Sequence, residues 1–485
     1  MKGLGPGTCS TMRRALCRGL GSRRPSRRVL LLASAALWLL GFVVRSLHAV
    51  DLATGLYSHE QPGTRMASRY DAAALAHLAG DGILYPRSWP EPSDTALVSR
   101  PPGYPVFIAL VYRALGRSGV AVQLVQSVLG AFLPVFLFLL ATGLFGVYVG
   151  LLAGAMAACS APLAWYCSVV TPDSLGSLLA VAVVTLFWRD RWRPGWTTVG
   201  AGLLLGAATW LRPNFLLLAV FFALGLLVAS PRWRRAAPWV LGSSAVAVLA
   251  VMPVTIRNWR IYHAFVPVSI NMGILVWEGI ADAGGERWGA RSRDAAVAIE
   301  EAAHSGDPRH ADWWASPDGI LRDRERMRRS LDVIRAEPVW FAAASVRRVG
   351  EMLDYREGGA QVVRAAAQEE GALGERLQPG EAAMLAPGRL VAFARRPIAF
   401  LQRALVASTL PLAVSGLGIC GLLSARRLLF LLLVPLYHLI TQAPLHYEPR
   451  YVLAMHAFVL VCAAAAVVGI ARAVLSVVQS ERRGT

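Results

Sequence analysis

The sequence predicts an all-α integral membrane protein, a polytopic bundle of about ten transmembrane helices with large loops on its outer face. Of the 485 residues, 55% are hydrophobic and only 16% are charged, whereas soluble proteins carry about 25% charge. The mean hydropathy is +0.47. Long apolar runs recur along the chain, and short arginine-rich segments separate many of them. These observations favour one bundle in a bilayer over a series of soluble domains.

The N-terminal half is predicted to hold seven of the spanning helices. Residues 1–28 are predicted to form a basic cytoplasmic segment. The apolar run 29–47 is long, and no small-residue cleavage site clearly follows it, so a retained first helix is favoured over a cleaved signal peptide. An N-terminal transmembrane module is expected over 29–256, with an outer loop at 48–119 that contains a short interfacial helix near 70–78. The further apolar runs of this module are 120–143, 148–165, 174–188, 197–211, 213–229 and 237–256.

The C-terminal half is predicted to begin with a second outer region, residues 257–401. Two helical stretches, 318–336 and 338–353, are separated by Glu337-Pro338, and the tryptophans of this region suit an interfacial cap. Residues 402–474 are expected to form the C-terminal transmembrane helices, with runs at 402–424, 428–443 and 451–474. Residues 475–485 form a cytoplasmic tail.

Arginine placement predicts the orientation. The net charge is +19, and much of it lies in short connections such as 189–193, 232–235 and 426–427, which the positive-inside rule assigns to the cytoplasm. Both termini are then cytoplasmic, in a multi-pass protein of the cell membrane whose polar surface faces the periplasm or equivalent outer side. Topology explains so much of the basic charge that nucleic-acid binding is not expected.

Polar side chains gather at the predicted outer helix ends. An arginine there opposes the positive-inside bias, so an anionic partner such as a phosphate becomes attractive, and carboxylates beside it suit a general base. Each segment also has a plainer explanation, as a stiff helix entry, an N-cap, an interfacial anchor or a polar knot. The segments are 100–105, 171–174, 212–214, 257–258 and 446–451. No strong metal-ligand spacing is visible, and a cofactor is left undetermined.

The same segments resemble a family. The stretches YDAAALAHLAGDGI, RPPGYPVFIALVY, TPDSLGSLLAV, GAATWLRPNFLLL, PVTIRNWRIYHAFVPVSINMG with the following WEG, and HYEPRYVLAMHAF occur in order across residues 29–475. They resemble the membrane glycosyltransferases of the GT-C fold. The bacterial branch related to dolichyl-phosphate-mannose protein mannosyltransferases and the lipid A aminoarabinose transferase is the most similar.

This resemblance implies an inverting transfer of a sugar from a polyprenyl-phosphate donor to a lipid, glycan or protein of the cell envelope, on the outer face. A first-loop acid would act as base or position the acceptor, and arginines would bind the donor phosphate. The expected catalytic residues are Asp71 and Asp173. The expected phosphate-binding residues are Arg100, Arg212, Arg257 and Arg450, and the expected substrate-binding residues are Tyr70, Tyr104, Asn258, His446, Glu448 and Tyr451.

The first outer loop departs from the family pattern. The family acid usually stands a few residues before the tyrosine matched by Tyr70, where this chain has Met66 and Ala67. Either Asp71 takes the role, or Asp51 or Glu60 folds in, or transferase activity is lost. A non-enzymatic transporter or flippase of lipid-linked sugars and an O-antigen-type polymerase or ligase are the alternative functions.

Overall fold

The computed structural model describes residues 25–52, 65–82, 90–189, 195–229, 233–354 and 389–484. Within these ranges the secondary structure is helical and contains no strand. The predicted fold class, an all-α membrane bundle with large polar loops, is confirmed. The basic segment 1–24 and the stretch 355–388 of the second outer region lie outside the described residues.

The N-terminal module follows the predicted apolar runs closely. Its first outer loop contributes α3, near the predicted interfacial helix, and α4, which the apolar runs did not indicate. The helices of this module are α2 (Arg27–Leu52), α3 (Arg65–Leu78), η1 (Ala96–Val98), α4 (Gly103–Leu115), α5 (Gly119–Gly130), α6 (Phe132–Phe145), α7 (Val147–Cys159), α8 (Ala161–Ser168), α9 (Asp173–Arg189), α10 (Trp196–Leu211), η2 (Pro213–Phe215), α11 (Leu218–Ala229) and α12 (Trp233–Tyr262).

The second outer region is a group of short helices that precedes the C-terminal spans. Two of them, α15 and α16, match the predicted stretches 318–336 and 338–353. The helices are α13 (Met272–Asp282), η3 (Gly285–Trp288), α14 (Asp294–Ser305), η4 (Pro308–Ala311), α15 (Gly319–Ala336), α16 (Pro338–Leu353), α19 (Arg389–Gln442), η5 (Pro449–Val452) and α20 (Leu453–Gly484).

Local chemistry explains where the helices break. Gly146 has φ 101°, in the left-handed region that suits glycine, and it ends α6 so that the chain can turn into α7. Ser160 is extended and Pro162 follows it at the start of α8, so α7 and α8 meet at a bend of 47°. Ser424, with φ −169° and ψ 107°, divides α19 into two arms at the predicted inner connection.

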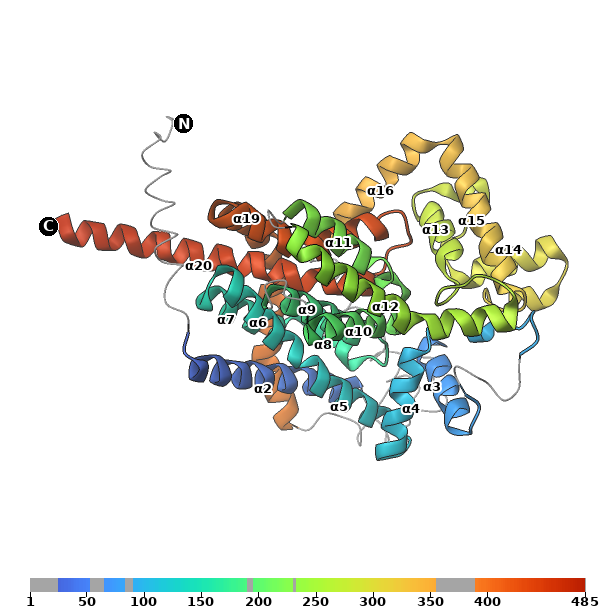
Figure 1. Cartoon of the computed structure of the whole chain (residues 1–485), viewed down its shortest axis with the longest axis horizontal. Coiled ribbons are helices and arrows are strands. Elements are labelled where there is room, and N and C mark those ends of the chain that lie inside the picture. Colours follow the sequence, from blue (N-terminus) through green and yellow to red (C-terminus); the bar gives the residue numbers. More distant parts are fainter. Residues whose placement is uncertain are drawn as a thin grey trace.

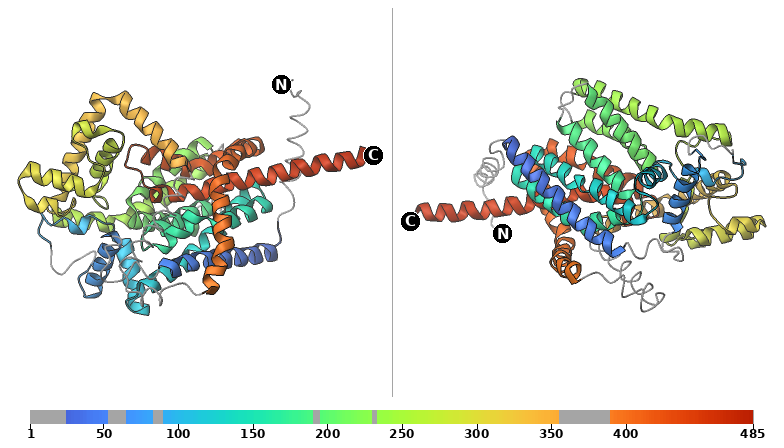
Figure 2. Two further views of the ribbon diagram at one scale, coloured as in Figure 1. Left: turned by 180° about the vertical axis from the view of Figure 1, so that it is seen from behind. Right: turned by 90° about the horizontal axis from the view of Figure 1, so that it is seen from below.

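The bundle and the outer helices lie at opposite ends of the molecule. Figure 1 shows the beginning of α2 and the far end of α20 at one end, whereas α13 to α16 form a cap at the other end. Helix α12 runs from the bundle to the cap, and the views in Figure 2 agree with this arrangement. The beginning of α2 and the end of α20 therefore share a face, as the predicted topology requires.

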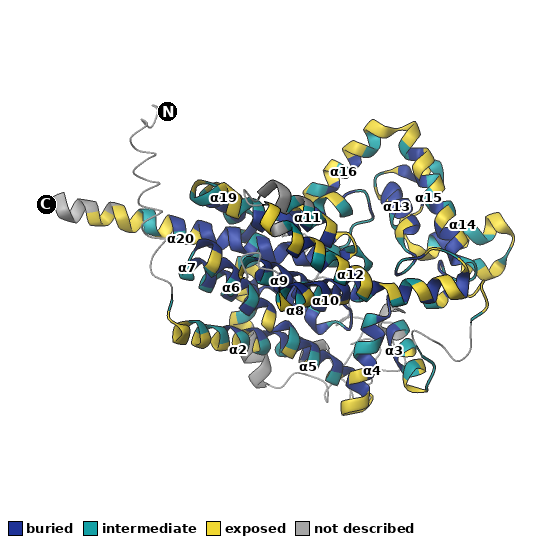
Figure 3. Cartoon of the chain, in the orientation of Figure 1, coloured by how far each residue is buried: buried dark blue, intermediate teal, exposed yellow. Residues whose placement is uncertain are grey.

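Burial separates an interior from a lipid-facing surface. Figure 3 shows buried residues along α9, α10 and the near part of α20, and exposed residues along one side of α2. Leu31 and Leu32 of α2 are 61% and 72% exposed. Apolar side chains on an outward helix face suit contact with lipid chains, whose polarity they match.

The number of complete spans differs from the prediction. In the described residues five helices are long and apolar enough to cross a membrane, or six if α7 and α8 form one bent span. One of the five covers both arms of α19, from Arg396 to Gln442, and α9 and α10 have only 17 and 16 residues. The predicted count of about ten treated every apolar run as one crossing.

Candidate functional site

Two adjoining cavities lie between the bundle and the cap. The smaller, of about 490 Å³, is lined by Trp165, Tyr166, Trp313 and Trp314 together with charged residues, and we call it the aromatic cavity. The larger, of about 610 Å³, is called the apolar cavity. Its apolar lining includes Leu216, Leu217, Met272, Ile274, Leu275 and Leu445.

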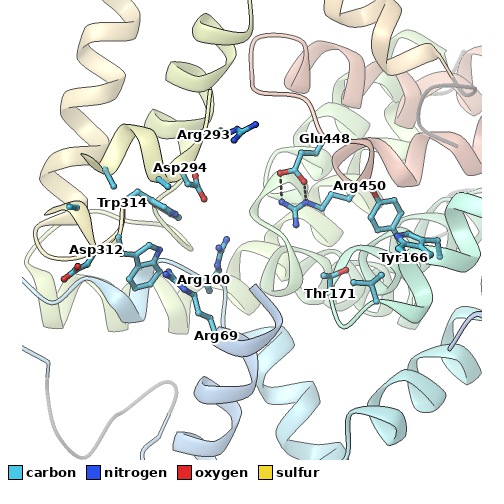
Figure 4. A pocket seen from close by; sticks show the side chains of 16 residues that line it. Arg69, Arg100, Tyr166, Thr171, Arg293, Asp294, Asp312, Trp314, Glu448 and Arg450 are labelled. Carbon is cyan, nitrogen blue, oxygen red and sulfur yellow. Dashed lines mark hydrogen bonds and ion pairs between the residues drawn. The ribbon is translucent and has the colours of Figure 1, made fainter. Parts of the chain in front are cut away.

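Six residues line both cavities and form what we call the shared wall: Arg100, Arg293, Asp294, Trp314, Glu448 and Arg450. Figure 4 shows Arg293 and Asp294 on the side of the cap, with Glu448 and Arg450 across from them. A wall with three arginines between an apolar space and an aromatic one suits an amphiphilic ligand with a negatively charged centre.

The predicted last outer turn contributes a compact charged group. Glu448 accepts a hydrogen bond from Nη2 of Arg450 to Oε1 at 2.6 Å, and the ion pair also brings Nε within 2.5 Å of Oε2. The guanidinium of Arg450 also lies 5.2 Å from the ring centre of Tyr451, and that of Arg212 lies 5.7 Å from it. Arg212, Tyr451 and His446 line the apolar cavity beside Glu448 and Arg450.

Asp173 is joined to this group through an ion pair. It is the first residue of α9, and its Oδ2 lies 2.5 Å from Nη2 of Arg212. Both side chains are buried, with exposures of 2% for Asp173 and 12% for Arg212. Asp173 is not among the residues that line the two cavities. Asp173 is therefore placed to hold Arg212 in position. Removing either member of this pair would leave the other charge uncompensated.

Asp71 lies apart from the cavity lining. Its carboxylate accepts a hydrogen bond from Tyr112 at 2.6 Å and pairs with Arg117 at 2.8 Å. Tyr70 and Tyr104 are buried and meet edge to face at 5.0 Å, and Tyr104 donates to Gln126. The upstream alternatives cannot be compared, since Glu60 and the side chain of Asp51 lie outside the described residues. Catalysis by Asp71 stays a prediction.

Arg257 and Asn258 are not among the residues that line the two cavities. Arg257 donates to Oδ1 of Asn258 at 2.6 and 2.9 Å, and Nδ2 of Asn258 donates to the carbonyl oxygens of Val266 and Val268. Both residues are buried. This network fixes the turn that follows α12, and phosphate binding by Arg257 stays a prediction.

Sequence reasoning missed several residues of the site. Arg293 and Asp294 stand in a stretch of mixed charge without a regular pattern, and Asp312 of the aromatic cavity lies in a similar one. Trp313 and Trp314 were interpreted as parts of an interfacial cap. Glu278 could have been found from the sequence, because it belongs to the WEG stretch that contributes to the family resemblance.

Several acids lie near Glu278, which lines the apolar cavity. Burial, followed by the nearby Asp294, Asp282 and Glu448, raises the pKa of Glu278 to about 10. Burial alone would lower the pKa of His446, but its hydrogen bond of 2.6 Å with Asp282 outweighs this and raises that pKa. In the part of the chain that the structure describes, no three His, Cys, Asp or Glu residues are grouped to hold a metal ion.

Comparison of the sequence with protein families gives one match. Residues 99–257 match the family described as dolichyl-phosphate-mannose-protein mannosyltransferase. This segment contains Arg100, Asp173 and Arg212, and the predicted resemblance to GT-C fold glycosyltransferases is confirmed. Comparison with curated proteins finds no match.

Solved structures of membrane glycosyltransferases are also similar. Oligosaccharyltransferase AglB from Archaeoglobus fulgidus, in complex with an inhibitory peptide and a dolichol-phosphate, is 13% identical with a TM-score of 0.45, over 92% of this chain and 52% of that one. ArnT from Cupriavidus metallidurans, bound to undecaprenyl phosphate, is 15% identical with a TM-score of 0.36, over 92% and 78%. The chain spans about half the length of the archaeal enzyme.

Proposed function

We propose that this protein transfers a sugar from a polyprenyl-phosphate donor to an acceptor of the cell envelope, which is a lipid, a glycan or a protein. The observation that carries the proposal is the shared wall, where arginines stand between an apolar and an aromatic cavity. The family match over residues 99–257 supports the same reaction class. The protein works from the outer face of the membrane, with both termini in the cytoplasm.

The lining of each cavity fits one part of such a donor. The apolar cavity, with Leu216, Leu217 and Met272, suits the first prenyl units, since apolar side chains match a hydrocarbon chain. The shared wall suits the phosphate, because the planar guanidinium fork matches its oxygens. The aromatic cavity suits the sugar and the acceptor, through flat indole and phenol faces beside polar groups.

The transfer would proceed with inversion. The acceptor oxygen attacks the anomeric carbon from the side opposite to the phosphate, and the bond between that carbon and the phosphate oxygen breaks. Negative charge then grows on the leaving phosphate, where positioned arginines stabilise it most in the transition state. A carboxylate accepts the proton of the acceptor. The sequence predicts Asp71 for this role and Asp173 as a second candidate acid.

The test uses purified protein and a synthetic polyprenyl-phosphate sugar, with envelope extract from cells that lack the gene as the source of acceptor. Release of polyprenyl phosphate that depends on the extract, together with sugar in an envelope product, is expected. Movement of intact donor across a proteoliposome membrane without such release would instead support the transporter.

A further inference from the structure

Two carboxyl groups from the cap meet at the edge of the apolar cavity. Glu278 lies on α13 and is only 4% exposed, whereas Asp294 is the exposed first residue of α14. Both line the apolar cavity, and Asp294 also lines the aromatic cavity. After burial, Asp294 is the neighbour that acts most strongly on the carboxyl of Glu278. Two neighbouring carboxyl groups can form a hydrogen bond when one of them keeps its proton.

The charges around the pair decide where that proton resides. Asp282 on α13 and Glu448 from the opposite loop add negative charge near Glu278. His446 is bonded to Asp282, and the arginines that line the apolar cavity are Arg100, Arg212, Arg293 and Arg450. Glu278 is the more buried member, and burial disfavours its charged form most strongly. Glu278 therefore keeps its proton, and its O–H can donate to a neighbouring carboxylate such as that of Asp294.

The carboxylates nominated by the sequence are engaged elsewhere. Asp71 is paired with Arg117 and Asp173 with Arg212, at 2.8 and 2.5 Å. Neither lines the two cavities. Asp294 stands on the shared wall, between the space assigned to the donor chain and the space assigned to the acceptor. Its position suits contact with a reacting hydroxyl better than theirs.

We propose that Asp294 is the general base of the sugar transfer and that the buried Glu278, which lines the same cavity, positions its carboxylate. The inference rests on the proposed function. The acceptor hydroxyl oxygen bonds to the anomeric carbon, and the bond from that carbon to the phosphate oxygen breaks. The electron pair of the broken bond stays on the phosphate beside the arginines of the shared wall. The hydroxyl proton passes to Asp294, whose exposed carboxyl returns it to water.

The first test compares Asp294→Asn, Glu278→Gln and Glu278→Leu by steady-state kinetics and donor binding. Asp294→Asn should lower kcat about 10²-fold or more, with donor affinity unchanged, since it removes the base. Glu278→Gln should stay near wild type, because its amide N–H can donate where the carboxyl O–H did. Glu278→Leu should lower kcat and move the acid limb of the pH–rate profile upward, because that donor is lost. Glu351→Gln, on the exposed face of α16, is the control.

A second test measures the retained proton without using activity. The pKa of Glu278 is raised to about 10 in the folded protein, while an unfolded glutamate titrates near 4.3. The folded state then binds the extra proton between these values, so stability falls as pH rises through that window. Glu278→Gln removes this dependence. It should raise the thermal midpoint at pH 7 and lose that advantage near pH 4.

The outcomes separate the inference from the function on which it rests. Wild-type turnover in Asp294→Asn, with loss of turnover in Asp71→Asn, would overturn the inference and leave the transferase intact. If no donor is cleaved by the wild-type protein, the proposed function fails, and the assignment of a base fails with it. An unchanged thermal midpoint at pH 7 in Glu278→Gln would show that Glu278 is ionised, which contradicts its positioning role.

Discussion

The arginines at the predicted outer helix ends lie in two different settings. Arg100 and Arg450 line both cavities, whereas Arg257 is bonded to Asn258 near the end of α12. In the sequence all three arginines stand at predicted outer helix ends. That position alone could not show which of them line a cavity. Contact with a cavity does distinguish them: Arg100 and Arg450 stand where a ligand in a cavity could be reached, whereas Arg257 contacts a neighbouring side chain.

Arg100 gives the sharpest test of phosphate binding. Its guanidinium lies 5.9 Å from the ring centre of Trp314, on the shared wall. Arg100→Gln should lower kcat/KM by about 10²- to 10³-fold, as removal of one transition-state donor does elsewhere. Arg100→Lys should be intermediate, because the charge remains and the fork is lost. Kinetics with the synthetic donor measure both effects.

The matched control is Arg113→Gln, an exposed arginine near the end of α4, which should leave turnover unchanged. Arg257→Gln should reduce the yield of folded protein more than it reduces donor affinity, because it breaks the network at the turn after α12. Equal kinetics for Arg100→Gln and Arg113→Gln would remove the phosphate role from Arg100.

His446 predicts a pH dependence of stability. Its pKa is raised in the folded protein by Asp282, against the effect of burial, whereas an unfolded histidine titrates near 6.5. The stabilisation is therefore complete below about pH 6.5 and is lost as pH rises through the folded value. Thermal unfolding of wild type and His446→Gln should differ most at acid pH and converge at alkaline pH. A constant difference across the range would contradict this.

At the scale of elements, the packing of α13 against the last outer turn assembles the site. The backbone N–H of His446 donates to the carbonyl of Leu275 at 2.7 Å. Arg348 of α16 donates to the carbonyl oxygens of Gly279 and Ala443 at 2.5 and 2.6 Å. These bonds tie together segments that are far apart in the sequence, and they bring Glu278 beside the turn that holds Glu448 and Arg450.

Gly279 permits this close packing. A Cβ on Gly279 would lie 2.7 Å from the carbonyl carbon of Leu445 and 2.8 Å from the backbone nitrogen of His446. Gly279→Ala must therefore move α13 away from the turn, at a cost of about 1–3 kcal/mol. Turnover should fall while the protein still inserts and folds.

Gly350→Ala is the control, because a Cβ there meets nothing within 4 Å and alanine favours a helix. It should be neutral or slightly stabilising by thermal unfolding. Similar turnover in the two alanine variants would show that the contact of α13 with the last outer turn is not needed for the reaction.

At the scale of the whole molecule, the apolar runs predicted where helices occur. They did not predict where a bend interrupts a helix. The run 148–165 becomes α7 and α8 because Ser160 and Pro162 interrupt it. The two runs on either side of Ser424 were predicted separately, and the backbone does break at that residue. Hydropathy records where a helix is buried or lipid-facing, whereas a bend depends on single residues and their contacts.

The site could be predicted only in part for a related reason. Arg212, Glu448 and Arg450 follow apolar runs, so their position at one face could be inferred from topology. Asp294 and Arg293 come from a cap without hydrophobic periodicity, and only the packing of α13 and α14 brings them to the cavities. Side chains that meet through tertiary packing leave no local pattern in a single sequence.

The orientation of the whole molecule is the premise of an outer-face reaction, and it has a direct test. The beginning of α2 and the end of α20 lie at one end of the molecule, and the cap lies at the opposite end (Figure 1). Single cysteines at Ser93 and Ala303, which are exposed near the cap, should react with a membrane-impermeant thiol reagent in intact cells. A cysteine at Ala425, beside the break of α19, should react only after the cells are opened. The reverse pattern would place both cavities on the cytoplasmic side, and a donor on the outer face could not reach the arginines of the shared wall.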